Sequence, residues 1–267
     1  MLGMKRDLGM RNLIWQYWDG AVPPAARYSS QLMKEYATRI GAEYLFEDNP
    51  KHIKNRGRYS PHLGQLKVID DPKFQEYDNV LFLDSDIFPV EGLDRNIFEG
   101  FNADIGICRE SWQTVNKPRN KKAEDSNWAT RIEKIYGGKL PRDSKGNLII
   151  YNSGCVMYSG KGIQNIRKNF IPLDDYMKSV RDLSVFATTD QLYLHANLQR
   201  VNWVELDEGW NSYVHYLPNT TGGINRPIND TRTSTTKFVH IQLRGADHFN
   251  NETLHRITNR PVKEWNI

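Results

Sequence analysis

The sequence feature that most constrains this chain is an unbroken apolar run, Val80-Leu81-Phe82-Leu83, followed at once by Asp84-Ser85-Asp86. Consecutive apolar residues without alternation are typical of a strand buried on both faces, as in the centre of a parallel sheet. Parallel strands need crossover connections that place helices on the faces of the sheet. The run therefore predicts an open α/β fold, in which ligands bind at the carboxyl ends of the strands.

Strand and helix patterns alternate around this run. Because 39 % of the 267 residues are hydrophobic, the chain can fill a large core, and we expect one domain over residues 1–267. Residues 11–108 form a nucleotide-binding half, 109–147 a polar variable insertion, and 148–267 a second half. We predict strands at 13–18, 42–46, 80–83, 103–108, 148–151, 155–158, 202–206 and 237–242, and helices at 29–40, 60–69, 128–136, 161–170 and 189–198, with turns at Gly41 and at 152–154.

Composition restricts the kinds of partner. The net charge is +4, with basic clusters at Lys117, Arg119, Lys121 and Lys122 and again around residues 56–58. Such clusters attract a diphosphate, an acidic membrane surface or nucleic acid. Since no zinc-finger spacing or aromatic RNA-binding pattern accompanies them, we expect no nucleic-acid partner.

Targeting signals and cysteines are sparse. No apolar run approaches the roughly 18 to 20 residues that span a bilayer, and the first ten residues lack the apolar stretch of a signal peptide. We therefore expect a soluble cytoplasmic protein without a transmembrane segment. Cys108 and Cys155 both lie in apolar, strand-like runs, which predicts buried free thiols.

The pair Asp84 and Asp86 predicts a metal site. Both carboxylates follow a buried strand, and like charges at such short range are costly unless a cation neutralises them. Hard oxygen ligands favour Mg²⁺ or Mn²⁺. The alternative is a strand end whose aspartates only cap turns.

Four further motifs follow the Asp-x-Asp strand in order. The strand itself, Tyr77 to Asp86, is followed by Tyr151-Asn152-Ser153-Gly154-Cys155-Val156, Asp190-Gln191, Trp210-Asn211 and Val239-His240. Together they resemble the GT-A class of glycosyltransferases, particularly the retaining family 8 enzymes of the glycogenin and galactosyltransferase type. The resemblance covers most of the chain. It implies a GT-A (Rossmann-like) fold, with a mixed, mainly parallel sheet flanked by helices.

The resemblance also implies an activity. The chain would be a metal-dependent hexosyl- or pentosyltransferase that moves a sugar from a nucleotide sugar, such as a UDP-sugar, to a hydroxyl acceptor on a glycan, glycoprotein or glycolipid. It implies retention at the anomeric carbon. His240 would complete a site for Mn²⁺ or Mg²⁺ with Asp84 and Asp86, and an imidazole ligand favours Mn²⁺. A lone histidine after an apolar strand is otherwise a hydrogen-bonded core residue.

Donor and acceptor residues are implied in the same way. Family 8 continues from this histidine into His-x-x-Gly-x-x-Lys, but here the lysine is absent and Arg244 is the candidate ligand of the diphosphate. Trp210 and Asn211 would lie on the acceptor side. The implied donor-binding residues are Trp15, Gln16, Tyr17, Lys67, Ser85, Asn152, Gly154, Gln191 and Arg244.

Asp190 is the candidate catalytic residue. It begins a predicted helix, where a carboxylate also stabilises the free N–H groups and the dipole. In a retaining reaction it would stabilise or attack the anomeric carbon, and in an inverting one it would activate the acceptor hydroxyl. Sequence reasoning leaves both roles open.

Two other functions fit parts of the pattern. A non-catalytic protein of the same fold would bind the nucleotide sugar without turnover. A phosphatase of the haloacid dehalogenase type also places Asp-x-Asp after an apolar strand. That motif would normally lie near the amino terminus and continue into Thr or Val, whereas Phe88 occupies the corresponding position here.

Overall fold

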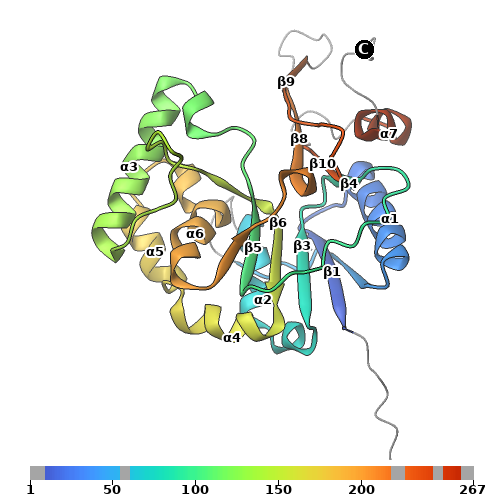
Figure 1. Ribbon diagram of the computed structural model, residues 1–267, viewed down its shortest axis with the longest axis horizontal. Coiled ribbons are helices and arrows are strands. Elements are labelled where there is room, and N and C mark those ends of the chain that lie inside the picture. The colour runs from blue at the N-terminus through green and yellow to red at the C-terminus, as the bar shows by residue number, and fades with distance from the viewer. Residues whose placement is uncertain (1–9, 55–60, 218–225, 243–248, 260–267) are drawn as a thin grey trace, which may run out of the picture.

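A six-stranded sheet forms the centre of the molecule (Figure 1). The computed structural model describes residues 10–54, 61–217, 226–242 and 249–259. The strand order is β2-β1-β3-β6-β5-β7, and only β6 runs antiparallel to its neighbours. The prediction of a mixed, mainly parallel sheet is therefore confirmed. The strands are β1 (Asn12–Trp18), β2 (Glu43–Asp48), β3 (Asn79–Leu83), β5 (Ile105–Arg109), β6 (Tyr151–Ser159) and β7 (Trp203–Glu205).

A second sheet of four strands begins directly after the Asp-x-Asp segment. It has the order β4-β10-β8-β9, and β10 pairs with β4 antiparallel and with β8 parallel. Because β3 belongs to the first sheet and β4 to the second, Asp84-Ser85-Asp86 forms the junction between the two sheets. These strands are β4 (Ile87–Pro89), β8 (Ser212–Leu217), β9 (Arg226–Asp230) and β10 (Phe238–Ile241).

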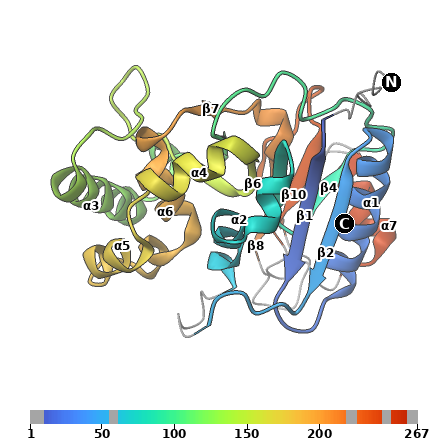
Figure 2. The ribbon, with the colours of Figure 1, turned by 90° about the horizontal axis from the view of Figure 1, so that it is seen from below.

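Helices flank the sheets, as predicted. Figure 2 shows α1 and α7 at one end of the molecule and α3 and α5 at the other. None of the helices in the described part of the chain combines the length and the apolar character that a bilayer crossing needs. The helices are α1 (Pro24–Arg39), α2 (Lys67–Asp70), α3 (Arg119–Tyr136), α4 (Gly160–Asn169), α5 (Leu173–Val180), α6 (Asp190–Asn197) and α7 (Asn251–Asn259).

The apolar run that predicted a central strand is buried along its whole length. Every residue of β3 is buried, between β1 on one side and β6 on the other. Cys108 and Cys155 are buried free thiols, as expected. Gly41 follows α1 with φ of 71°, a conformation that favours glycine and ends the helix there.

Four local predictions were wrong in whole or in part. The strand expected at 148–151 begins only at Tyr151, the first residue of β6. The expected turn at residues 152–154 lies inside β6, at an irregularity in its pairing with β5, because Asn152 pairs with β5 and the residues from Cys155 onward pair with β3. The helix expected at 128–136 begins at Arg119, since Trp128, Ala129 and Ile132 bury one face of a longer helix. Of the helix expected at 60–69, the described part is a 3₁₀ turn, η2 (His62–Leu66), followed by the single turn of α2.

His195 on α6 is buried among aromatic rings and makes the fold sensitive to acid. Its ring centroid lies 5.0 Å from Trp128 and 5.4 Å from Tyr151, and neither ring nitrogen has a hydrogen-bond partner among the described residues. Burial, and next to it the charge of Lys117, lowers the pKa of His195 to about 3. The fold therefore favours the neutral imidazole.

Below the unfolded pKa of His195, we expect the free energy of unfolding to fall by about 1.4 kcal/mol for each unit by which the pH is lowered. Its stabilising effect is complete above the unfolded pKa of about 6.5 and is lost as the pH falls from there toward 3. Urea unfolding measures the free energy of unfolding at pH 6.5 and at pH 5. The difference between the two pH values should be about 2 kcal/mol smaller in His195→Phe than in the parent protein. His255→Gln, at an exposed histidine of α7, should leave that difference unchanged. If the free energy of unfolding changes equally between the two pH values in all three proteins, the prediction is contradicted.

Candidate active site

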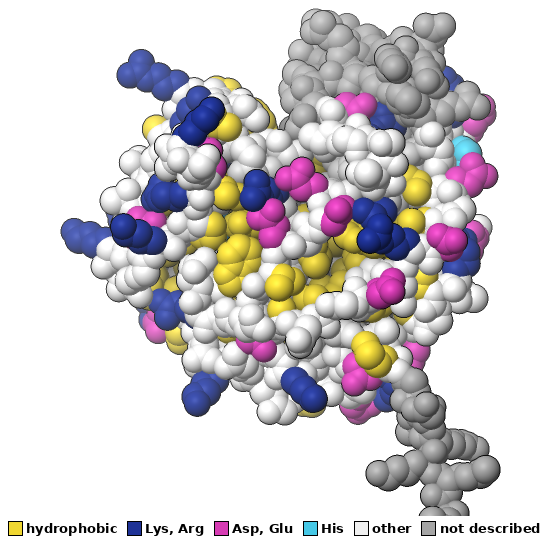
Figure 3. Space-filling model, viewed as in Figure 1, with side chains coloured by type: hydrophobic (Ala, Val, Ile, Leu, Met, Phe, Trp, Pro, Cys, Tyr) yellow, Lys and Arg dark blue, Asp and Glu magenta, His cyan; other side chains and the backbone are white. Residues whose placement is uncertain are grey.

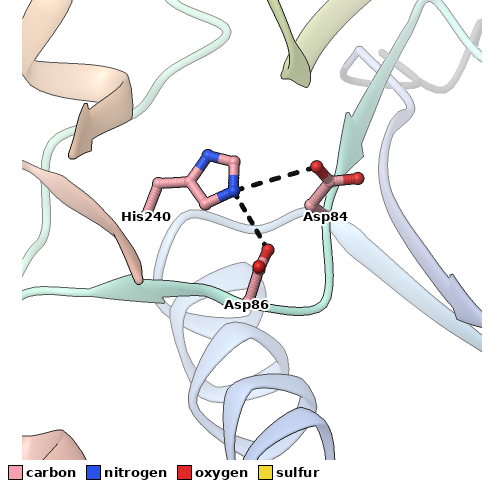
Figure 4. A group of neighbouring side chains, drawn as sticks. All are labelled: Asp84, Asp86 and His240. Carbon is pink, nitrogen blue, oxygen red and sulfur yellow. Dashed lines mark ion pairs between the residues drawn. The ribbon is translucent and has the colours of Figure 1, made fainter. Parts of the chain in front are cut away.

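Asp84, Asp86 and His240 converge at the junction of the two sheets (Figure 4). His240 Nε2 lies 3.1 Å from Asp86 Oδ1 and 3.9 Å from Asp84 Oδ2. One ligand atom from each residue lies within 4.8 Å of the others. His240 is 4 % exposed, whereas 43 % of the Asp84 side chain is accessible, so the group opens to solvent on the Asp84 side.

Neighbouring strands hold the Asp-x-Asp segment in place. The Asp84 N–H donates to the Gly154 carbonyl of β6 at 2.8 Å. From β1, Gln16 Nε2 donates to the Asp84 carbonyl at 3.0 Å, and Ser85 Oγ donates to the Tyr17 carbonyl at 2.8 Å. Ser85 is thus turned toward β1, which leaves the two aspartates on either side of it free to face His240.

Two asparagines orient the imidazole. His240 Nδ1 lies 3.0 Å from Asn211 Oδ1, and Asn211 Nδ2 donates to Asn152 Oδ1 at 2.8 Å. The ring of Tyr213 packs against that of His240, with centroids 4.2 Å apart. With Nδ1 turned to an amide oxygen, Nε2 faces the carboxylates, which is the arrangement that a metal-binding histidine needs.

The charges of the group favour a cation. Burial and the charge of Asp86 raise the pKa of Asp84 to about 7, although solvent weakens the first of these causes at a side chain so exposed. Burial acts to lower the pKa of His240, but the carboxylates of Asp86 and Asp84 outweigh it and the pKa is raised. Both shifts favour the protonated form, which reduces the crowded negative charge, and a divalent cation would reduce it in the same way.

Gly154 leaves the space that the three ligands need. A Cβ atom at this position would lie 2.6 Å from His240 Cε1 and 2.7 Å from Asp84 Oδ2. We expect Gly154→Ala to push these side chains apart and to weaken Mn²⁺ binding about tenfold to a hundredfold, the range seen for disturbed metal surroundings. Titration calorimetry with Mn²⁺ measures the effect. Unchanged Mn²⁺ affinity in a folded variant would argue against a metal at this position.

A polar cluster lies next to the group formed by Asp84, Asp86 and His240. Asn152 Nδ2 donates to Gln191 Oε1 at 3.0 Å and to the Tyr213 hydroxyl at 2.8 Å, and Gln191 Nε2 donates to Glu110 Oε2 at 2.8 Å. Sequence reasoning identified Asn152 and Gln191 but missed Glu110 and Tyr213. Glu110 directly follows β5, so its strand-end position was a usable signal, whereas nothing in the sequence places Tyr213 here.

Asp190, at the start of α6, lies close enough to Asp84 to affect its charge. Asp190 Oδ2 accepts a short hydrogen bond from Gln65 Nε2, and Gln65 also donates to the Ser153 carbonyl. Burial raises the pKa of Asp190, while His62, Ser153 and Gln65 oppose the increase. The charge of Asp190 in turn raises the pKa of Asp84. Asp190, the candidate metal ligands Asp84, Asp86 and His240, and the polar cluster therefore form one site.

The side chains expected to contact the nucleotide have protein partners. Trp15 is fully buried, and its Nε1 donates to Glu47 Oε2 at 2.7 Å. Lys67 Nζ lies 3.3 Å from Glu47 Oε1. Tyr17 is 9 % exposed, and its hydroxyl donates to the Pro61 carbonyl. Trp15 and Lys67 thus both contact Glu47 of β2.

The remaining predicted residues differ in position. Trp210 packs edge-on against Phe238 at 5.0 Å and belongs to the core, from which it supports the neighbouring Asn211. Arg244 lies outside the described residues.

Structural comparison identifies the fold. The chain is similar to a glycosyltransferase involved in the glycosylation of the major capsid of PBCV-1, with a TM-score of 0.52 and 13 % identity over 93 % of this chain and 98 % of that one. It is also similar to an active-site variant of LgtC, with a TM-score of 0.52 and 12 % identity over 94 % and 98 % of the two chains. No protein-family model and no curated protein sequence matches it. The predicted GT-A fold is confirmed.

Proposed function

We propose that this protein is a metal-dependent glycosyltransferase that uses a nucleotide-sugar donor. The observation that carries the proposal is the convergence of Asp84, Asp86 and His240 with the Asn152, Gln191 and Asp190 side chains at one site. Open α/β folds bind their ligands at such strand ends. The similarity in fold to two glycosyltransferases supports the same conclusion.

The ligand set fits a divalent cation. One ligand atom from each of the two carboxylates and the imidazole lies within 4.8 Å of the others, and Gly154 leaves room beside them. Oxygen ligands suit both Mg²⁺ and Mn²⁺, and the imidazole favours Mn²⁺. When bound, such an ion stabilises the negative charge that develops on a departing nucleotide diphosphate. Asp84, Asp86 and His240 would hold it.

The polar cluster is suited to a sugar. Asn152, Gln191 and Glu110 offer amide donors and carboxylate acceptors within a few ångströms of one another, which matches the alternating hydroxyl donors and acceptors of a hexose or pentose. Asp190 would contact the anomeric carbon in a reaction with retention, stabilising positive charge or acting as the nucleophile. Burial raises the pKa of Asp190, so its surroundings disfavour an uncompensated negative charge there.

The nucleotide would occupy the β1 side of the site. The base and ribose would lie against the end of β1, at Trp15, Gln16 and Tyr17, with Lys67 beside them. Arg244 is the proposed ligand of the diphosphate. A uridine diphosphate sugar is the proposed donor. Trp210 and Asn211 support the acceptor side, where a glycan, glycoprotein or glycolipid hydroxyl would enter.

A panel of nucleotide sugars, with and without Mn²⁺, tests this function. We expect Mn²⁺-dependent nucleotide release for at least one UDP-sugar, with the product retaining the anomeric configuration by NMR. Saturable binding of the nucleotide sugar without turnover, across a panel of sugar acceptors, would instead indicate a non-catalytic binding protein. Release of inorganic phosphate from phosphomonoesters would indicate a phosphatase.

A further inference from the structure

Exposed apolar side chains gather where η4 (Thr114–Asn116) approaches η5 (Val185–Thr188). Val115, Val185 and Phe186 are 47 %, 48 % and 37 % exposed. Within the described residues, only Met10 and Ile135 are other large hydrophobic side chains with such exposure. Lys117 connects the two segments, because its Nζ lies 5.7 Å from the centroid of the Phe186 ring.

Basic side chains continue this surface at the start of α3. Arg119, Lys121 and Lys122 are exposed, and the first turn of the helix has no acidic residue. Lys121 pairs with Glu124 at 2.9 Å, whereas Arg119 and Lys122 form no ion pair with any residue of the described segments. Positive charge at a helix N-terminus opposes the helix dipole, so these residues reduce helix stability slightly. Their position therefore indicates a role in binding an anion.

The two kinds of side chain lie side by side. Figure 1 shows the start of α3 at the upper left, and in the same view Figure 3 shows Lys and Arg side chains there beside hydrophobic ones. Lys117 itself is only 8 % exposed and pairs with Asp125 at 3.0 Å, so it fixes the geometry and adds little accessible charge. We call the exposed group, Val115, Arg119, Lys121, Lys122, Val185 and Phe186, the apolar-basic surface.

We propose that the apolar-basic surface binds an anionic lipid membrane. Apolar side chains bordered by cations match the boundary between acyl chains and negatively charged headgroups. Nucleic acid would be attracted by the cations but gains nothing from exposed valines, so a bilayer fits the combination better. The ion pair between Lys117 and Asp125 links η4 to α3 and so fixes the apolar side chain of η4 relative to the basic side chains of α3.

The position of the surface connects it with the site. The chain leaves β5, passes Glu110 and reaches η4, and η5 is followed directly by Thr189 and Asp190. Gln113 fastens the first of these segments by donating to the Ile150 carbonyl at 2.8 Å. If the proposed transferase function holds, membrane binding would bring this side of the site to acceptors at the lipid surface.

Sedimentation of the full chain with lipid vesicles tests the proposal without donor or metal. We expect binding to phosphatidylcholine vesicles that contain phosphatidylglycerol and no binding to phosphatidylcholine alone, with the bound fraction falling as salt rises. Lys121→Glu with Lys122→Glu should weaken binding about tenfold or more. Val185→Ser with Phe186→Ser should also weaken it about tenfold, through lost apolar burial.

A matched control lies at the other end of the same helix. Ile135 is 48 % exposed and follows the exposed Lys134, so Lys134→Glu with Ile135→Ser changes the same kinds of side chain elsewhere. This control should bind vesicles like the parent protein. The proposal would be overturned by any of three results. Both surface variants could bind vesicles as well as the parent protein does, the control could lose as much vesicle binding as they do, or the protein could bind RNA but not vesicles. Nucleotide release in solution reports separately on the transferase function.

Discussion

Replacing Asp84 or Asp86 by asparagine is expected to lower Mn²⁺-dependent nucleotide release by roughly 10²–10³-fold, the size of effect typical for a group that stabilises transition-state charge. Each variant removes one anionic ligand but keeps the shape of the side chain. The three ligand atoms lie within 4.8 Å of one another, so two remaining ligands cannot enclose an ion in the same way. Initial rates over a range of Mn²⁺ concentrations measure the loss.

The rates should not recover at saturating Mn²⁺ if the lost ligand also positions the donor. Asp94→Asn is the matched control, because Asp94 is an exposed aspartate that follows β4 a short distance along the same chain segment. It should leave both Mn²⁺ affinity and rate unchanged. Full activity in Asp84→Asn and Asp86→Asn, with normal Mn²⁺ dependence, would remove the metal from the proposed mechanism.

Asp190→Asn is expected to lower the turnover number roughly a hundredfold or more while changing donor affinity little, since groups that act on the reacting centre contribute about 10²–10⁴-fold. Asparagine keeps an oxygen that can accept from Gln65 Nε2, so the local structure should persist. The change removes the negative charge that we propose acts on the anomeric carbon. Separate determination of kcat and KM for the donor distinguishes the two effects.

The control for this prediction is an aspartate with the same structural role. Asp175 also lies in the first turn of a helix, and its side chain is 57 % exposed. Asp175→Asn removes the favourable interaction with the helix dipole but no group of the site. It should match the parent protein in both constants; a similar kcat for Asp190→Asn and the parent would exclude Asp190 from the chemical step.

The order of motifs along the chain was sufficient to predict the fold and the strand end that carries Asp84 and Asp86. An apolar run with no alternation can bury both faces only in the middle of a sheet, so the position of Asp84 and Asp86 at a strand end followed from local pattern alone. The helical spacing of Met33 and Tyr36 likewise predicted a helix that buries those residues.

Local patterns failed where pairing partners decided the structure. Residues 152–154 have the composition of a turn, yet pairs on both sides of them, Asn152 with β5 and Cys155 with β3, keep them within a nine-residue strand. Residues 109–147 read as polar and weakly periodic, yet α3 begins at Arg119 because Trp128 and Ile132 pack against the neighbouring helices. Both cases show tertiary contacts overriding local propensity.

The sequence by itself determined which strand carries the two aspartates and which side chains are chemically able to bind a metal, because both depend on residues next to one another. Only the tertiary structure decided which distant groups join them. Pairing of β10 with β4 brings His240 to Asp86, and Asn211 and Asn152 then fix the ring. Glu110 and Tyr213 enter the site for the same reason, since the end of β5 and the start of β8, far apart in the chain, both lie beside Asn152.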